Sequence, residues 1–104
     1  MNAYGHTLVV PKAHCERLWD IDRQDLANLM AAVQELCLRY RSRFGATGFT
    51  LLHASGAAAQ QSVPHVHLHL LPRFAGDGLD AWPPLPPLQV DRADLMTRLG
   101  SFAP

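Results

Sequence analysis

The sequence carries no net charge, because nine Lys and Arg residues balance nine Asp and Glu residues. A chain without excess positive charge lacks the field that would hold duplex nucleic acid through counterion release. We therefore expect no nucleic-acid partner. A small anionic ligand stays open, since it needs only local hydrogen-bond donors.

Cysteine is scarce, since the chain contains only Cys15 and Cys37, and their spacing matches no metal site. Two isolated cysteines are typical of reduced thiols in a reducing compartment. We therefore assign them no chemistry.

Long apolar runs are also absent. No run approaches the ~20 residues that a membrane-spanning helix needs. The first residues, Met1 to His6, lack the basic start and apolar stretch of a signal peptide. We expect no membrane association and a cytoplasmic location.

The length and composition predict one folded domain. The chain has 104 residues, of which 48% are hydrophobic and 17% charged, so it is too apolar for disorder and too short for two stable cores. We interpret residues 1–104 as a single domain, in which residues 73–104 form an extension rich in proline and glycine. A short helix capped by Asp91 is expected near its end.

The segment from Asp22 to Phe44 has the periodicity of an amphipathic helix, with apolar residues at steps of three and four. Asp22 is the expected N-cap, and Gly45 follows as a C-terminal stop. The apolar positions are Leu26, Leu29, Met30, Val33, Leu36, Cys37, Tyr40 and Phe44. One small sheet is not expected to cover so broad a stripe, so we predict a homodimer that pairs through helix 22–44.

Three segments have strand character: His6–Val10, which ends at Pro11, then Phe49–His53 and Val63–Leu71. The small-residue stretch Ala54–Ala59 favours a close-packed loop between the second and third strands. We predict an α+β fold in which an antiparallel sheet packs its apolar face against the long helix.

Histidine is the over-represented residue, with six copies in the chain. In Val63–Leu71 the residues alternate strictly, so His65, His67 and His69 share one face, while Val66 and its apolar neighbours occupy the other. Imidazoles two residues apart on a strand are separated by roughly 6.5–7 Å. The segment therefore predicts a row of imidazoles on one surface and core on the other.

Three interpretations of this row are open. The first is a polar face of a half-exposed strand. The second is a zinc site with His53 or His14 as a further ligand, although no Asp, Glu or Cys lies between His53 and Leu71. The third is nucleophilic catalysis by one imidazole. The small and amide-bearing residues from Ser55 to Ser62 favour the third, because their backbone N–H groups could cradle a phosphate.

The residues His65-Val66-His67-Leu68-His69-Leu70-Leu71 resemble the signature of the histidine triad family of nucleotide hydrolases and transferases, in which three histidines alternate with apolar residues. Two further segments are similar to family segments in the same order: Gly5–Lys12 with the following His14, and Gly56–Pro64. The resemblance extends from about Gly5 to Arg73. Trp82-Pro83-Pro84 is similar to the tail of one branch.

The resemblance implies roles for four histidines. His67 is implied as the nucleophile that forms a covalent nucleotidyl-imidazole. His65 is implied to orient it, with His6 hydrogen-bonded behind His65, and His69 to contact the phosphate. A histidine rather than a glutamine as third member favours the hydrolase branches over the uridylyltransferase branch.

The resemblance also implies substrate-binding residues near the row. Ser62 would lie near the leaving-group oxygen, and Gln61 and the Val63 amide near the phosphate oxygens. His14 lies close to the same site in the family.

The activity implied is hydrolysis of nucleotide phosphoanhydrides or phosphoramidates, namely adenosine monophosphate derivatives or dinucleoside polyphosphates, without a metal or other cofactor. Two features depart from the family pattern: Ala54 replaces a usual Asn, and the chain starts just before Gly5, where family members have a further helix and strands. We therefore expect a chain shortened at its N-terminus. The alternative function is a non-catalytic nucleotide-binding module.

Overall fold

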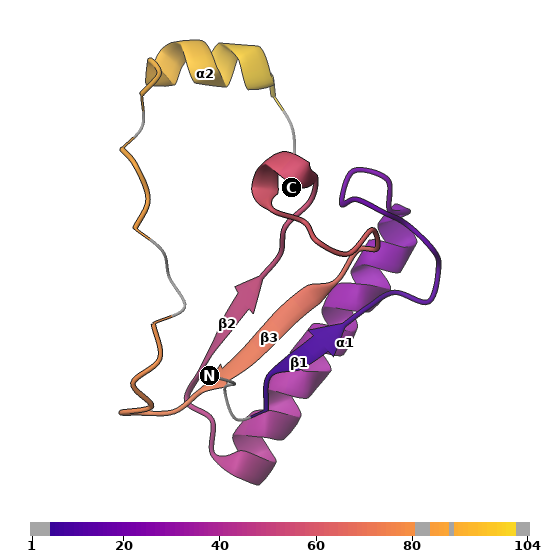
Figure 1. Cartoon of the computed structure of the whole chain (residues 1–104), viewed down its shortest axis with the longest axis vertical. Helices are drawn as coiled ribbons and strands as arrows, with labels where there is room; N and C mark the ends of the chain where they lie inside the picture. The colour runs from indigo at the N-terminus through magenta and orange to yellow at the C-terminus, as the bar shows by residue number, and fades with distance from the viewer. Residues whose placement is uncertain (1–4, 81–83, 88, 102–104) are drawn as a thin grey trace.

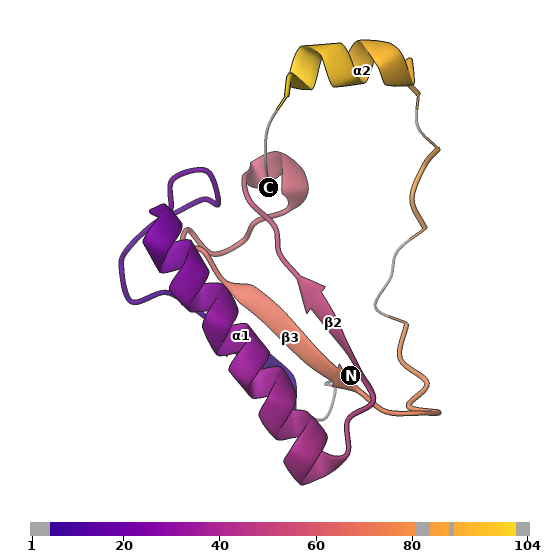
Figure 2. The same cartoon turned by 180° about the vertical axis from the view of Figure 1, so that it is seen from behind.

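The computed structural model describes residues 5–80, 84–87 and 89–101. Three antiparallel strands form one sheet in the order β1-β3-β2, and helix α1 lies across one face of it (Figures 1 and 2). The α+β prediction is confirmed. The elements are β1 (Thr7–Val9), α1 (Arg23–Phe44), β2 (Gly48–Leu52), the 3-10 helix η1 (Ala57–Ala59), β3 (Leu68–Arg73) and α2 (Arg92–Leu99).

Helix α1 begins and ends where the sequence predicts. The Asp22 carboxylate accepts hydrogen bonds from the backbone N–H of Gln24 at 3.1 Å and of Asp25 at 3.4 Å. Gly45 has a positive φ of 73°, and its N–H donates to the carbonyl of Arg41 at 3.2 Å. Both caps satisfy backbone groups that a helix leaves without partners at its ends.

The core lies between α1 and the sheet. Val66, Leu68 and Leu70 are almost fully buried, and each such side chain contributes about 1.5–3 kcal/mol relative to exposure. The other buried members are Val9, Cys15, Leu29 and Val33, with Ile21, Leu36, Cys37 and Phe49 packed against them. Both cysteines are free thiols.

The apolar stripe of α1 is therefore mostly internal. Leu29 and Val33, two members of the stripe through which we predicted pairing, lie in the core. The large apolar side chains of α1 that stay exposed are Met30, Leu38 and Phe44, at 42%, 52% and 51% of their full exposure. Any pairing through this helix would have to use these residues.

Tyr40, another member of the predicted stripe, anchors the start of β1. Its hydroxyl donates to the carbonyl of Gly5 at 2.9 Å. Gly5 has a positive φ of 79°, and a Cβ atom at this position would lie 2.9 Å from Tyr40 Cε1. Glycine is thus required both by backbone conformation and by the close approach of the ring.

The third strand is shorter at its start than the predicted Val63–Leu71. It begins at Leu68, because its neighbours end there: Val9 is the last residue of β1 and pairs with Leu68, and Leu52 is the last of β2 and pairs with His69. Alternating hydrophobicity indicates a face, but a strand also needs neighbours to pair with.

Residues 63–67 are held by other bonds. The N–H of Val66 donates to the carbonyl of Cys15 at 2.8 Å, and the N–H of His65 donates to the carbonyl of Val63 at 2.8 Å. Alternation continues through this segment, since Val66 is buried between the half-buried His65 and His67. The side chains of residues 63–67 therefore keep the predicted faces, although this segment is not hydrogen-bonded into the sheet as a strand.

At its other end β3 continues to Arg73. The Arg73 guanidinium donates to both carboxylate oxygens of Asp77, at 2.9 and 3.1 Å, and to Thr50 Oγ1 at 3.1 Å. These bonds hold the pKa of Asp77 well below its usual range, with help from the backbone N–H groups of Leu79 and Phe74. This ion pair fixes the turn in which the chain leaves the sheet.

Helix α2 is capped as expected, because the Asp91 carboxylate accepts from the N–H of Asp94 at 2.9 Å. It contains no buried residue and lies at the end of the molecule away from α1 (Figure 1). The predicted similarity at Trp82-Pro83-Pro84 falls largely on residues 81–83, which are outside the described residues. In the described part of the chain, no helix has the length and apolarity needed to cross a bilayer.

Candidate active site

Three histidines lie in a row on the sheet face opposite α1. His69 belongs to β3, and His65 and His67 lie in the segment before it. The His67 and His69 rings are 5.1 Å apart between centroids, in an edge-to-face arrangement. The structure therefore brings the His67 and His69 rings together, and all three histidines are half-buried.

The His67 ring is oriented by the backbone. Its Nδ1 lies 2.8 Å from the carbonyl oxygen of His65. Because a carbonyl oxygen can only accept, Nδ1 carries the hydrogen, and the neutral ring therefore has its lone pair on Nε2. This tautomer makes Nε2 the nucleophilic atom.

The His65 side chain is directed away from His67, toward the segment that follows β1. Its Nε2 donates to the carbonyl of Pro11 at 3.3 Å, and its Nδ1 lies 3.4 Å from Nδ1 of His14. The backbone carbonyl of His65 thus contacts the His67 ring, while the His65 ring contacts the ring of His14.

The expected bond between His6 and His65 is wrong. His6 Nε2 instead lies 3.0 Å from Nδ1 of His69. The strand register explains the difference: Leu8 of β1 pairs with His69, so His6, two residues earlier, shares their face and lies diagonally across from His69.

The environment of His69 favours its neutral form. Burial lowers the pKa of His69 below the ordinary value of a histidine, and positive charge on His67, His6 or His53 would lower it further. A neutral His69 adds no positive charge beside the ring of His67.

A cavity of about 250 Å³ opens beside the row. None of the described residues that line it is Lys, Arg, Asp or Glu, so an anion there would rely on imidazole, hydroxyl and amide groups. The lining residues are Leu52, His53, Ala54, Ala59, Gln60, Gln61, Ser62, His67 and His69.

Gln61 braces the loop that forms one wall of this cavity. Its Oε1 accepts from the N–H of Gly56 at 2.7 Å, and its Nε2 donates to the carbonyls of Glu16 at 2.7 Å and Val63 at 2.9 Å. The side-chain amide is fully engaged with backbone groups. Gln61 and Ser62 both line the cavity, whereas Val63, although half exposed, does not.

Gln60 lies in the left-handed region with a φ of 68°, and it is the one non-glycine residue of the described chain with a positive φ. It follows the 3-10 helix η1, and its N–H donates to the carbonyl of Ala57 at 3.0 Å. The close-packed loop predicted for Ala54–Ala59 thus contains one helical turn closed by a strained residue.

His53 was expected only as a possible zinc ligand. The structure places it on the cavity wall beside His67 and His69. Its position as the last residue of the predicted strand Phe49–His53, at the end that leads into the loop before the histidine row, is the sequence signal that could have marked it.

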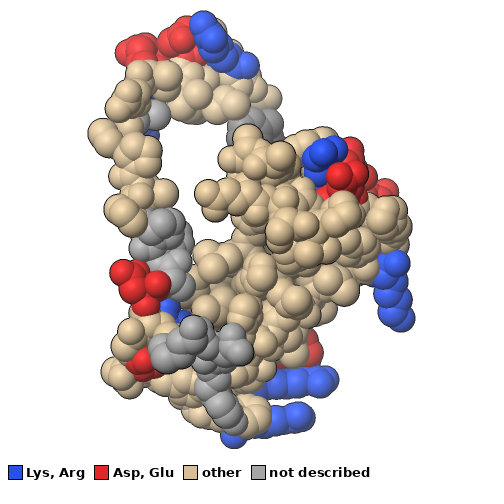
Figure 3. All heavy atoms as spheres, in the orientation of Figure 1, with Lys and Arg blue, Asp and Glu red and all other residues tan. Residues whose placement is uncertain are grey.

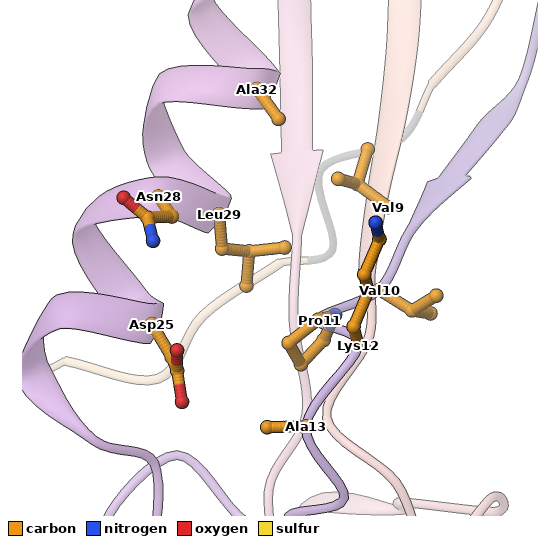
Figure 4. A pocket seen from close by; sticks show the side chains of 9 residues that line it. All are labelled: Val9, Val10, Pro11, Lys12, Ala13, Asp25, Asn28, Leu29 and Ala32. Atoms are coloured by element: carbon orange, nitrogen blue, oxygen red, sulfur yellow. The ribbon is translucent and has the colours of Figure 1, made fainter.

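A second cavity, of about 350 Å³, lies between α1 and the segment after β1 (Figure 4). Asp25, Asn28, Leu29 and Ala32 line its helical wall, and residues 9–13 line the other. It contains none of the histidines, so it is separate from the chemistry considered above.

Charged side chains are scattered over the surface. Figure 3 shows blue and red groups at the periphery of one face, with no continuous basic area on it. Within the described residues, no group of three or more His, Cys, Asp or Glu side chains is arranged to hold a metal ion. The rings of the row hydrogen-bond to backbone carbonyls and to the rings of His6 and His14.

Comparisons with known proteins find relatives that match about 70% of this chain. The family model described as "HIT domain" matches residues 2–76. An uncharacterized HIT-like protein of Methanocaldococcus jannaschii is 39% identical over 74 residues, which cover 71% of this chain. A bifunctional bis(5'-adenosyl)-triphosphatase/adenylylsulfatase of Arabidopsis thaliana is 35% identical over 73 residues, which cover 70% of it.

Among solved structures, a zinc-bound histidine triad family protein from Mycobacterium smegmatis matches with a TM-score of 0.68 and 38% identity, covering 74% of this chain and 56% of that one. The chain spans about half the length of the curated relatives that it matches, 57% of the archaeal protein and 41% of the plant enzyme.

Proposed function

The chain belongs to the HIT domain family, and on that premise we propose that it hydrolyses phosphoanhydride or phosphoramidate bonds of nucleotide derivatives through a covalent nucleotidyl-His67 intermediate. The substrates we propose are adenosine monophosphate derivatives and dinucleoside polyphosphates. The Arabidopsis relative, a bifunctional bis(5'-adenosyl)-triphosphatase/adenylylsulfatase, supports this class.

One observation carries the proposal: the 2.8 Å contact between His67 Nδ1 and the carbonyl oxygen of His65. It leaves the Nε2 lone pair available beside a cavity of about 250 Å³. It also stabilises the positive charge that the ring acquires on attack, because the same N–H then donates from a cationic ring.

The reaction proceeds in two displacements. In the first, the lone pair of His67 Nε2 forms a bond to the α-phosphorus, the bond from phosphorus to the leaving group breaks, and the leaving group takes up a proton. In the second, a water oxygen attacks the phosphorus and loses a proton, and the N–P bond breaks. The products are a nucleoside monophosphate and free His67.

We assign supporting roles to the other site residues. His69 contacts the phosphate, and His6 orients His69 through their 3.0 Å bond. His65 orients His67 through its carbonyl, with His14 paired to the His65 ring.

Three loop residues complete the assignment. We assign Ser62, on the cavity wall, to the leaving-group oxygen. The assignment of the Val63 N–H to the phosphate is supported by the family resemblance alone, because Val63 does not line this cavity. Gln61 acts through the loop that it braces.

We also propose a homodimer, formed through the exposed part of α1. Met30, Leu38 and Phe44 are large apolar side chains left in water by the isolated chain. A two-fold axis would bury each of them twice, which favours a symmetric pairing.

The test is hydrolysis of adenosine 5'-phosphoramidate and of a diadenosine polyphosphate by the purified chain and by its His67→Ala variant. The proposal predicts turnover by the wild type and at least a ~10³-fold loss in the variant, about 4 kcal/mol of barrier. Tight binding of both compounds without turnover would instead establish the non-catalytic binding module.

A further inference from the structure

His53 makes a second contact with the backbone of the proposed nucleophile. Its Nδ1 lies 3.0 Å from the carbonyl oxygen of His67. As with His67 itself, the carbonyl can only accept, so Nδ1 of His53 carries the hydrogen and Nε2 of the neutral ring is an acceptor. The acceptor is occupied, since Ser55 Oγ lies 2.5 Å from Nε2.

The hydrogen bonds continue in one direction beyond Ser55. The backbone N–H of Leu18 donates to Ser55 Oγ at 2.9 Å, which leaves the hydroxyl hydrogen for His53 Nε2. The order is therefore Leu18 N–H to Ser55, Ser55 to His53, and His53 to the His67 carbonyl. Each group has only one role open to it, so the tautomer of His53 is fixed.

The bond from His53 Nδ1 to the His67 carbonyl lies at a place where the sheet supplies no backbone hydrogen bond. Leu52 is the last residue of β2 and pairs with His69, and extending that register would place Ala54 opposite His67. Ala54 lies outside β2, so the His67 carbonyl has no ladder partner there. The His53 imidazole reaches it from the end of β2 and replaces the missing strand bond.

We propose that His53 is a positioning residue that holds the backbone of His67, through the bond from His53 Nδ1 to the His67 carbonyl, and so aims the His67 ring at the phosphorus. The inference rests on the proposed function for its catalytic consequence. His53 itself does not touch the reacting atoms in this assignment.

The geometry of imidazole allows its two nitrogens to be tested separately. The side-chain nitrogen of Asn is bonded to Cγ, as Nδ1 is, so His53→Asn keeps a donor for the His67 carbonyl. The side-chain oxygen of Gln is one atom further out, near the place of Nε2, so His53→Gln keeps only an acceptor for the Ser55 hydroxyl. His53→Leu keeps neither and has a similar volume.

The first readout is kinetic. Asn should leave kcat near the wild-type value, whereas Gln and Leu should each lower kcat by about tenfold or more with little change in KM, because misplacing a reacting group affects mainly the chemical step. Thermal unfolding of all three variants identifies any that fail to fold.

The second readout does not depend on turnover. Relaxation of the His67 backbone amide, measured by NMR on the full chain without substrate, should show an ordered backbone in the wild type and Asn variant and added motion in the Gln and Leu variants. If the wild type hydrolyses no nucleotide, the proposed function fails while this measurement still tests His53.

Three results would overturn the inference: an ordered His67 in all variants, added motion in all variants, or an ordered His67 in the Gln variant and not in the Asn variant. The last would assign the effect to Ser55 rather than to the His67 carbonyl.

Discussion

His67 Nδ1 and the carbonyl oxygen of His65 lie 2.8 Å apart, so a backbone group two residues away sets the tautomer of the proposed nucleophile. A peptide carbonyl keeps its hydrogen-bonding character at every pH at which the chain folds. The direction of the His67 lone pair is therefore independent of the titration of the neighbouring rings. Those rings control charge in the site instead.

His69 should make stability depend on pH. Its pKa is lowered in the folded chain from 6.5, mainly by burial, so the unfolded chain takes up the proton first as the pH falls. The stabilising contribution of neutral His69 is complete above about pH 6.5 and is lost as the pH drops through the lowered folded value. Urea unfolding from pH 8 to pH 5 should show a steeper loss for the wild type than for His69→Gln. If the wild type and His69→Gln lose equal stability over this pH range, the prediction is wrong.

Activity should not depend on a bound metal. The rings of the row are hydrogen-bonded to backbone carbonyls and to the rings of His6 and His14, and no ligand set is found among the described residues. Hydrolysis should therefore survive EDTA, and purified protein should contain substoichiometric zinc by elemental analysis. Loss of activity on chelation, with recovery on adding zinc, would favour a metal site in this chain as well.

Replacing Gln60 by glycine should stabilise the fold. Gln60 has a φ of 68°, a conformation that costs residues with a Cβ about 1–2 kcal/mol. Part of this gain is offset by the greater freedom of glycine in the unfolded chain, so we expect about 1 kcal/mol in urea unfolding. Gln60→Ala is the matched control, since it keeps the Cβ and should give no such gain. Equal stability of both variants would show that the loop is not strained.

The dimer makes a separate prediction. Sedimentation of the wild type at micromolar concentration should give twice the 11.5 kDa chain mass. Leu38→Asp places a charge on the exposed part of α1 and should give a folded monomer, whereas Val33→Asp should unfold the chain because Val33 is only 5% exposed. A monomeric wild type would contradict the proposed dimer. An unfolded Leu38→Asp variant would contradict the claim that Leu38 is exposed on α1 while Val33 belongs to the core.

Helix α1 was predictable because its determinants are local. Asp22, the three- and four-residue spacing and Gly45 all lie within one segment, and the structure uses them as the sequence indicates. The two faces of the histidine segment were predictable for the same reason, since alternation needs only neighbouring residues.

The start of β3 and the partners of the histidines depended on distant residues. Where β1 and β2 end decides that β3 begins at Leu68, and the register of Leu8 with His69 decides that His6 meets His69. Gln61 was expected at the phosphate from the family resemblance, yet it reaches the Glu16 carbonyl 45 residues away. Such contacts follow from register and loop packing, which periodicity does not report.

The central claim is the covalent intermediate on His67. A single turnover with adenosine 5'-phosphoramidate, stopped at neutral to alkaline pH because N–P bonds are acid-labile, can be digested and analysed by mass spectrometry. The account predicts an adenylyl adduct on the peptide that contains His67, on that residue, and none in His67→Ala. Turnover without an adduct in the wild type, or an adduct on His65 or His69 instead, would contradict it.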